Sequence, residues 1–177
     1  MHEQANFLRT VILGNSGSGK SWLSRHLSGV LACKAIDLDG IHWEPGSYSA
    51  ARDRQIALEL VQTAAVGERW VIEGAYGWLA AEALPRATAL VWCAIPVEEC
   101  LVNLRQRGVR RGGDAETFAA LLDWAGGYAT RQTSSSHAGH ERMFQGFHGR
   151  KVKLSTRQDF SDLLGAIRPP GAVPGPG

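Results

Sequence analysis

The sequence has few cysteines, little net charge and no long apolar run. Cys33, Cys93 and Cys100 are an odd number without regular spacing, which argues against a disulfide framework and favours a reducing compartment. Lys and Arg number 19 and Asp and Glu 17, so the net charge of +2 does not indicate nucleic-acid or membrane binding. No apolar run approaches the ~20 residues that cross a bilayer. We therefore expect a cytoplasmic protein that does not bind a membrane.

Short apolar runs alternate with helical patterns along the 177 residues. The expected strands cover 8–13, 34–39, 69–74, 87–95 and 150–156. The expected helices cover 20–31, 51–65, a segment around Cys100, 115–125 and 159–167. Strands that alternate with helices favour a parallel sheet with helices on both of its faces. The sequence therefore predicts the α/β class.

We find no internal repeat and expect a single domain over residues 1–168. One long stretch, from about 107 to 148, lies outside the core pattern, and its part from 126 onward is polar and glycine-rich without a clear period. We interpret this stretch as a mobile excursion. Residues 169–177 are rich in Pro and Gly, so we expect a disordered tail.

The segment GNSGSGKS, Gly14 to Ser21, matches the phosphate-binding pattern G-x-x-x-x-G-K-[ST]. It follows an expected strand and opens an expected helix, whose free N–H groups would attract an anion. Lys20 would reach the outer phosphates and the Ser21 hydroxyl would ligate magnesium. A plain Gly/Ser turn is the alternative. The predicted nucleotide-binding residues are Gly14, Asn15, Ser16, Gly17, Ser18, Gly19, Lys20, Ser21 and Trp22.

Two carboxylates follow the second expected strand, in the segment AIDLDGIHW. Asp37 and Asp39 lie two residues apart, so a strand would point both side chains to one face. Ligands of such sheets bind beyond the carboxyl ends of the strands. Here the two groups could hold magnesium-bound water or accept a proton from a substrate hydroxyl. Alternatively, one of them caps the next turn.

Glu73 ends the third expected strand, in the segment WVIEGAY. A buried carboxylate needs a cation, water or hydrogen bonds, and magnesium near Ser21 would supply the cation. An exposed position at the strand end is the alternative. Together, these observations predict a magnesium site formed by Ser21, Asp37 and Glu73.

Several arginines lie in or across the excursion: Arg105, Arg107, Arg110, Arg111 and Arg131. Forked guanidinium donors neutralise the charge that develops in phosphoryl transfer, although a basic surface turn would have the same sequence. We predict a lid that closes over phosphates, with Arg107, Arg111 and Arg131 as its catalytic residues. We expect Trp43 to serve packing rather than substrate binding.

With these motifs in place, the chain resembles the small P-loop kinases related to adenylate and shikimate kinases. Within that group it resembles especially the DNA topology modulation proteins, which are adenylate-kinase-like ATPases. The resemblance runs from about Leu8 to Ile167 and rests on GNSGSGKS, DLDGIHWEPG, WVIEGAYG and Pro96 with the Arg-rich turn after it. It implies a three-layer P-loop NTPase fold with a five-stranded parallel sheet and a lid.

The sequence and the resemblance together predict a magnesium-dependent protein that binds ATP, with GTP possible, and transfers its terminal phosphoryl group. Lys20 would hold the phosphates and Asp39 would orient an unidentified small-molecule acceptor. The run EGAYG contains no counterpart of the Arg with which nucleoside monophosphate kinases hold the acceptor phosphate. The alternative function is a slow ATPase that acts as a regulatory or nucleic-acid-associated switch. We expect a monomer or a homodimer.

Overall fold

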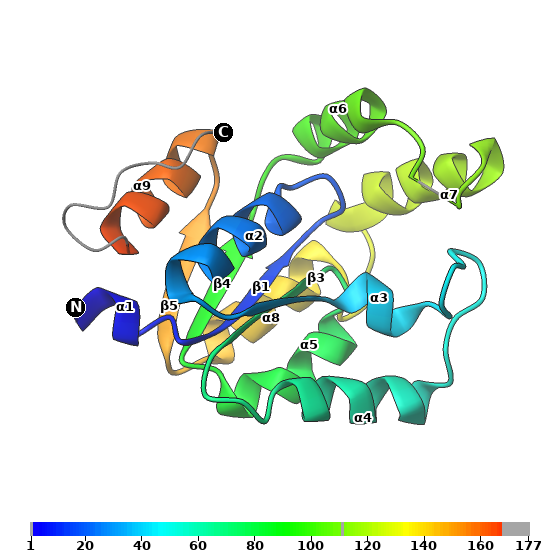
Figure 1. Ribbon diagram of the computed structural model, residues 1–177. Helices are drawn as coiled ribbons and strands as arrows, with labels where there is room; N and C mark the ends of the chain where they lie inside the picture. Colours follow the sequence, from blue (N-terminus) through cyan, green and yellow to red (C-terminus); the bar gives the residue numbers. More distant parts are fainter. Residues whose placement is uncertain (1, 111, 168–177) are drawn as a thin grey trace.

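Five parallel strands form the centre of the computed structural model, which describes residues 2–110 and 112–167 (Figure 1). The strands are β1 (Arg9–Gly14), β2 (Lys34–Asp37), β3 (Trp70–Gly74), β4 (Ala89–Cys93) and β5 (Arg150–Leu154). Their order across the sheet is β2-β3-β1-β4-β5, with every neighbouring pair parallel. The predicted five-stranded parallel sheet is confirmed. The expected tail at 169–177 lies outside the described residues.

Helices cover both faces of this sheet, as the sequence predicts. The helices are α1 (His2–Ala5), α2 (Lys20–Leu31), α3 (Leu38–His42), α4 (Arg54–Ala64), α5 (Gly77–Ala83), α6 (Val97–Arg107), α7 (Ala115–Gly126), α8 (His137–Gly146) and α9 (Arg157–Ile167), with 3-10 turns η1 (Leu84–Arg86) and η2 (Gly127–Ala129). No helix of the described segments is long and apolar enough to span a membrane.

The core consists of two apolar clusters, one on each face of the sheet. Alternate residues of β1 supply them: Ile12 belongs to the cluster under α2 and α9, and Val11 and Leu13 belong to the cluster under α4, α5 and α8. This division follows from the two-residue repeat of a strand. Because β1 is buried on both faces, it reads as a continuous apolar run rather than an alternating one.

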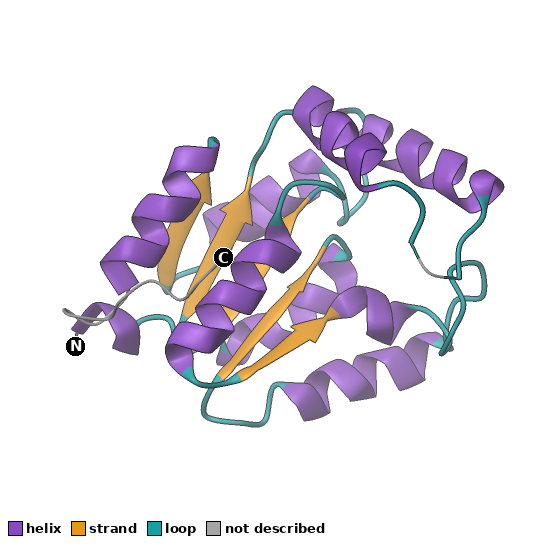
Figure 2. Cartoon of the chain, turned by 45° about the horizontal axis from the view of Figure 1, so that its top comes forward, coloured by secondary structure: helices purple, strands orange, loops and turns teal. Residues whose placement is uncertain are grey.

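α8 corrects the expected extent of the excursion. Residues 107–148 were expected to leave the core, yet Met143 and Phe144 of α8 pack against the second apolar cluster. The residues that α8 buries completely are Gly139 and His140, neither of which contributes to an apolar period. The sequence pattern therefore missed this helix. The part of the excursion away from the sheet is shorter and contains α7, which lies beside α6 where the strands end (Figures 1 and 2).

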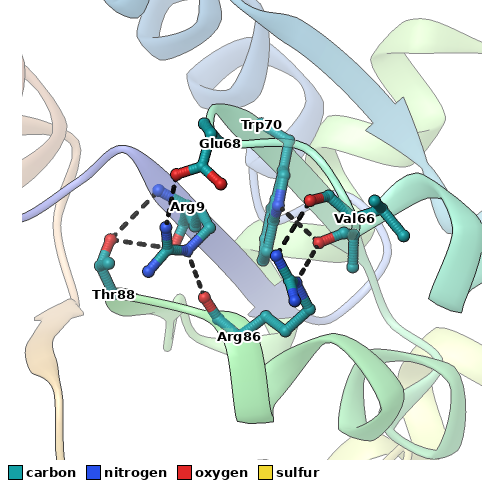
Figure 3. A network of polar contacts seen from close by, with 7 residues as sticks. Arg9, Val66, Glu68, Trp70, Arg86 and Thr88 are labelled. Carbon is teal, nitrogen blue, oxygen red and sulfur yellow. Dashed lines mark hydrogen bonds and ion pairs between the residues drawn. The ribbon is translucent and has the colours of Figure 1, made fainter.

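The opposite end of the sheet is fixed by a network of polar contacts (Figure 3). Arg86 donates hydrogen bonds to the carbonyls of Ala65 and Val66, at 2.7 and 2.9 Å. The Trp70 indole also donates to the Ala65 carbonyl, at 3.2 Å, and Arg9 pairs with Glu68. These bonds satisfy carbonyl groups at the end of α4 and fix the turn into β3. The network therefore holds the fold at the end of the sheet remote from the glycine loop.

Candidate active site

The glycine loop connects β1 to α2 with a backbone that side chains would obstruct. Gly17 and Gly19 have φ angles of 80° and 92°, in the left-handed region that favours glycine. A Cβ atom at Gly19 would lie 2.7 Å from a guanidinium nitrogen of Arg157, and one at Gly17 would lie 2.9 Å from Leu104. At Gly17 the backbone carbonyl of Cys100 also leaves no room for a Cβ atom. At Gly19, where the flexible Arg157 side chain could move, the φ angle is what favours glycine. The loop has the shape of a phosphate cradle.

Lys20 and the first turn of α2 give the loop its positive character. Lys20 is only 7% exposed, and its Nζ donates a 2.7 Å hydrogen bond to the carbonyl of Asn15. Within the described chain, no side chain caps the amino end of α2, whose N-cap residue is Gly19. The first N–H groups of a helix lack partners within the helix, and they attract anions. The lysine ammonium and these N–H groups can therefore serve a bound triphosphate.

Glu73 places a buried carboxylate beside the lysine. Glu73 is the penultimate residue of β3, and its side chain is buried, with 4% exposure. Burial raises the pKa of Glu73, whereas the Lys20 ammonium and a hydrogen bond with the Ser21 side chain oppose that rise. In the sheet register Glu73 is the direct neighbour of Asp37 on β2. Desolvation and then the charge of Asp39 raise the pKa of Asp37.

The oxygen donors beside the loop suit magnesium better than a metal that takes all of its ligands from protein side chains. Ser21, Asp37 and Glu73 offer a hydroxyl and two carboxylates, all hard ligands. Residues 2–110 and 112–167 contain no group of three or more His, Cys, Asp or Glu side chains that could hold a metal. Magnesium usually takes one or two carboxylates and completes its shell with phosphate and water. The buried carboxylate beside Ser21 matches that preference.

Asp39 does not share a strand face with Asp37, so this prediction is wrong. β2 ends at Asp37, which caps α3 by accepting a 2.8 Å hydrogen bond from the Asp39 N–H. Asp is a favoured N-cap residue, and the alternative interpretation of this pair is therefore correct for Asp37. Asp39 lies in the first turn of α3, where Oδ2 is 3.4 Å from Nη1 of Arg110.

The arginines of the excursion have different surroundings. Arg107 ends α6, and partial burial followed by the charge of Arg110 lowers the pKa of Arg107. Arg110, which was absent from the predicted catalytic set, makes the ion pair with Asp39. It lies in the same basic turn, so a signal for it was present. Arg111 lies outside the described residues.

Arg131 holds the carboxyl end of α7. Its guanidinium lies 4.1 Å from the centroid of the Trp124 ring and donates to the carbonyls of Trp124 and Ser135. These contacts stabilise the junction between α7 and α8. The predicted role of Arg131 in a lid that closes over bound phosphates stays a prediction.

The side chains of two asparagines bind the loop to its neighbouring helices, through contacts that the sequence pattern does not predict. Asn15 is fully buried, and its Nδ2 donates a 2.9 Å hydrogen bond to the carbonyl of Ala125, near the end of α7. Asn103 of α6 donates to the carbonyl of Gly17, also at 2.9 Å. The phosphate loop is therefore tied directly to both helices at this edge. Trp22, by contrast, is 42% exposed on α2 and contacts His26.

A chain of buried hydrogen bonds runs from the junction between α7 and α8 toward the end of β3. The Trp92 indole donates to the Tyr128 hydroxyl at 3.1 Å, and that hydroxyl lies 2.8 Å from Nδ1 of His140. Nε2 of His140 lies 3.0 Å from the carbonyl of Ala75. Because a carbonyl only accepts, Nε2 carries the proton and Nδ1 accepts from Tyr128. Burial lowers the pKa of His140 to about 3, so this histidine is neutral.

Solved structures with the same architecture include several kinases. A shikimate kinase from Acinetobacter baumannii, solved in complex with shikimate, superposes with a TM-score of 0.54 at 16% identity, covering 90% of each chain. A sugar kinase from Janibacter sp. HTCC2649 gives 0.52 at 15% identity, covering 89% of this chain and 90% of that one. A gluconokinase from Sinorhizobium meliloti 1021 gives 0.51 at 16% identity, covering 89% and 87%.

These likenesses show that the chain shares the fold of these structures, a parallel sheet covered by helices, as the sequence predicts. No protein-family model and no curated protein sequence matches the chain. The fold is therefore established by structure, and the activity has to be argued from the site.

Proposed function

We propose that the protein is a magnesium-dependent phosphotransferase that moves the terminal phosphoryl group of ATP, or of GTP, to a small acceptor. The observation that carries the proposal is the buried Glu73 carboxylate, adjacent to Lys20 and Ser21 at a glycine loop. The titles of similar solved structures name shikimate kinase, gluconokinase and a sugar kinase, which favours a small-molecule acceptor. Action in the cytoplasm, as a monomer or a homodimer, belongs to the same proposal.

The loop and the first turn of α2 would bind the phosphates through backbone N–H groups. Lys20 would exchange its bond to the Asn15 carbonyl for bonds to the outer phosphate oxygens. Ser21, Asp37 and Glu73 would hold magnesium, which neutralises phosphate charge when bound. Binding would therefore supply the cation that the buried Glu73 carboxylate needs.

Asp39 would receive the proton of the acceptor hydroxyl. As that oxygen forms a bond to the terminal phosphorus, the bond from phosphorus to the bridging oxygen breaks and the nucleoside diphosphate leaves. The ion pair with Arg110 holds the Asp39 carboxylate in place. Arg107 and Arg131 would neutralise charge on the phosphates as the lid closes, and the same role is proposed for Arg111, which follows Arg110 in the sequence.

A paired substitution tests these assignments. Asp39→Asn should lower turnover by ~10²–10⁴-fold, the usual contribution of a general base, and leave ATP–magnesium affinity almost unchanged. Asp37→Asn should weaken the magnesium dependence more than acceptor use, and the fold should survive because Asn also caps helices. Asp162→Asn, on exposed α9 surface, is the matched control.

The readouts are nucleotide affinity by calorimetry and phosphoryl transfer. Loss of ATP–magnesium binding in Asp39→Asn with no change in Asp37→Asn would reverse the two roles. If the wild-type protein only hydrolyses ATP, slowly and without an acceptor, the protein is instead the switch ATPase suggested by its resemblance to DNA topology modulation proteins.

A further inference from the structure

Five aromatic side chains gather next to Asp39, and we name them the ring cluster: His42, Trp43, Tyr76, Trp78 and Trp124. They come from three parts of the chain. Two belong to α3 and its C-cap, two to the start of α5, and one to α7. All five are half-buried, so each ring keeps some accessible surface. The cluster therefore differs from the fully buried aromatics of the core, such as Trp70 and Trp92.

His42 is the central ring of the cluster. It stacks on Tyr76 with centroids 4.0 Å apart and an interplanar angle of 30°. Trp43 and Trp78 meet it edge-on, at 4.5 and 6.0 Å. Tyr76 in turn lies 6.1 Å from Trp124 of α7. Such stacked and edge-on pairs hold rings in defined positions, so they form a rigid surface of faces and edges.

The carboxylate proposed to accept the proton lies beside this surface. Asp39 is three residues before His42 on α3, so the two side chains are neighbours along the helix. Burial and then the charge of Asp39 raise the pKa of Tyr76, which places the carboxylate close to that ring as well. Burial lowers the pKa of His42, so the central ring is neutral at pH 7. A molecule lying against the cluster can therefore reach Asp39.

Four arginines around the cluster make contacts of their own. Arg54 lies over the Trp78 ring at 4.3 Å, and Arg52 donates to the carbonyl of Trp43 at 3.1 Å. Arg131 is bound at the end of α7, and Arg110 pairs with Asp39. An acceptor carboxylate would have to displace one of these contacts. The accessible parts of the half-buried rings are what the cluster itself offers to an acceptor.

We propose that the acceptor is an alcohol that carries a flat aromatic or heteroaromatic ring, which stacks on the ring cluster and presents its hydroxyl to Asp39. This inference rests on the proposed kinase function. The hydroxyl oxygen bonds to the terminal phosphorus of ATP, the phosphorus–oxygen bond to ADP breaks, and the proton passes to Asp39. Trp43 would then contact the substrate in addition to packing against His42.

The test compares two groups of acceptors on the full chain with ATP and magnesium. Adenosine, uridine and pyridoxine each carry a flat aromatic or heteroaromatic ring and form the ring-bearing group, whereas shikimate, gluconate and glucose carry no such flat ring. We expect labelled phosphate to reach a ring-bearing alcohol and that alcohol to quench tryptophan fluorescence. Transfer only to shikimate, gluconate or glucose, which lack a flat aromatic ring, would overturn the inference and leave the kinase function intact. ATP binding without transfer to any ring-bearing alcohol would also overturn it. Absence of ATP binding would overturn the kinase function itself.

Variants then separate stacking from stability. Base–aromatic stacking contributes ~1–3 kcal/mol, so Tyr76→Leu should raise the KM of the ring-bearing acceptor on the order of tenfold or more. Tyr76→Phe keeps the ring and should restore a KM near that of the wild type, and neither variant should change ATP affinity. Phe147→Leu, a half-buried ring at the opposite end of the sheet, is the matched control. Equal KM values in Tyr76→Leu and the control would contradict the stacking role.

Discussion

His140 should make the folded protein sensitive to mild acid. Its ring lies fully buried between the Tyr128 hydroxyl and the Ala75 carbonyl, and burial lowers its pKa to about 3. The unfolded chain returns the ring to an ordinary pKa of about 6.5. Below that pH the unfolded state therefore binds a proton that the folded state does not. Stability is fully retained above about pH 6.5 and is lost progressively as the pH falls toward 3.

The size of this effect follows from the two pKa values. Protonation of the unfolded ring lowers the unfolding free energy by about 2 kcal/mol at pH 5 and by about 4 kcal/mol at pH 3. The value at pH 5 depends mainly on the unfolded pKa, because the folded ring stays neutral there. His140→Gln removes the titration while its amide can still donate to the Ala75 carbonyl and accept from Tyr128.

The assay is urea unfolding of the wild type and His140→Gln at pH 7 and pH 5. Other groups titrate in both proteins, including Asp37 and Glu73, so the difference between them isolates the histidine. The wild type should lose about 2 kcal/mol more than the variant between the two pH values. His148→Gln, at an exposed position, should behave as the wild type does. Parallel losses in the wild type and His140→Gln would refute the buried neutral ring.

Two further predictions concern the phosphate loop, and a third concerns the lid. Lys20→Ala should abolish most ATP affinity in calorimetry, because the phosphates lose their buried flexible cation, and unchanged affinity in a folded variant would contradict the loop assignment. Asn15→Ala leaves the Ala125 carbonyl without its partner, which should cost about 1–3 kcal/mol and speed hydrogen exchange in α7. In the wild type, an ATP analogue with magnesium should slow exchange across residues 112–126, and equal rates with and without it would argue against a lid.

The sequence predicts the sheet well because its strands are short apolar runs that are buried on both faces. Val11, Ile12 and Leu13 are consecutive apolar residues, so both faces of their strand have to be covered, as they are at the centre of this sheet. α8 escaped prediction because it buries Gly139 and His140 and has only Met143 and Phe144 to contact the core. Hydrogen bonds and close backbone packing secure this helix, and neither leaves a periodic apolar signature.

The site was predictable where local chemistry determines it. The glycine loop opens α2 and Glu73 is buried, as their sequence positions predict, whereas the binding roles of these residues stay predictions. Asp39 was misplaced because Asp37 ends its strand two residues earlier by capping α3, a local competition that the spacing alone cannot resolve. The Asn15 bond to Ala125 joins residues 110 positions apart, so only the fold brings it into view.

The central claim is that this site transfers a phosphoryl group rather than releasing it to water. The most direct measurement follows terminally labelled ATP in a single turnover with magnesium and a pool of hydroxyl-bearing metabolites. We predict that the label moves to an organic acceptor in the wild type and that Asp39→Asn suppresses this transfer while ATP remains bound. Label found only in inorganic phosphate, at the same rate in both proteins, would contradict the account.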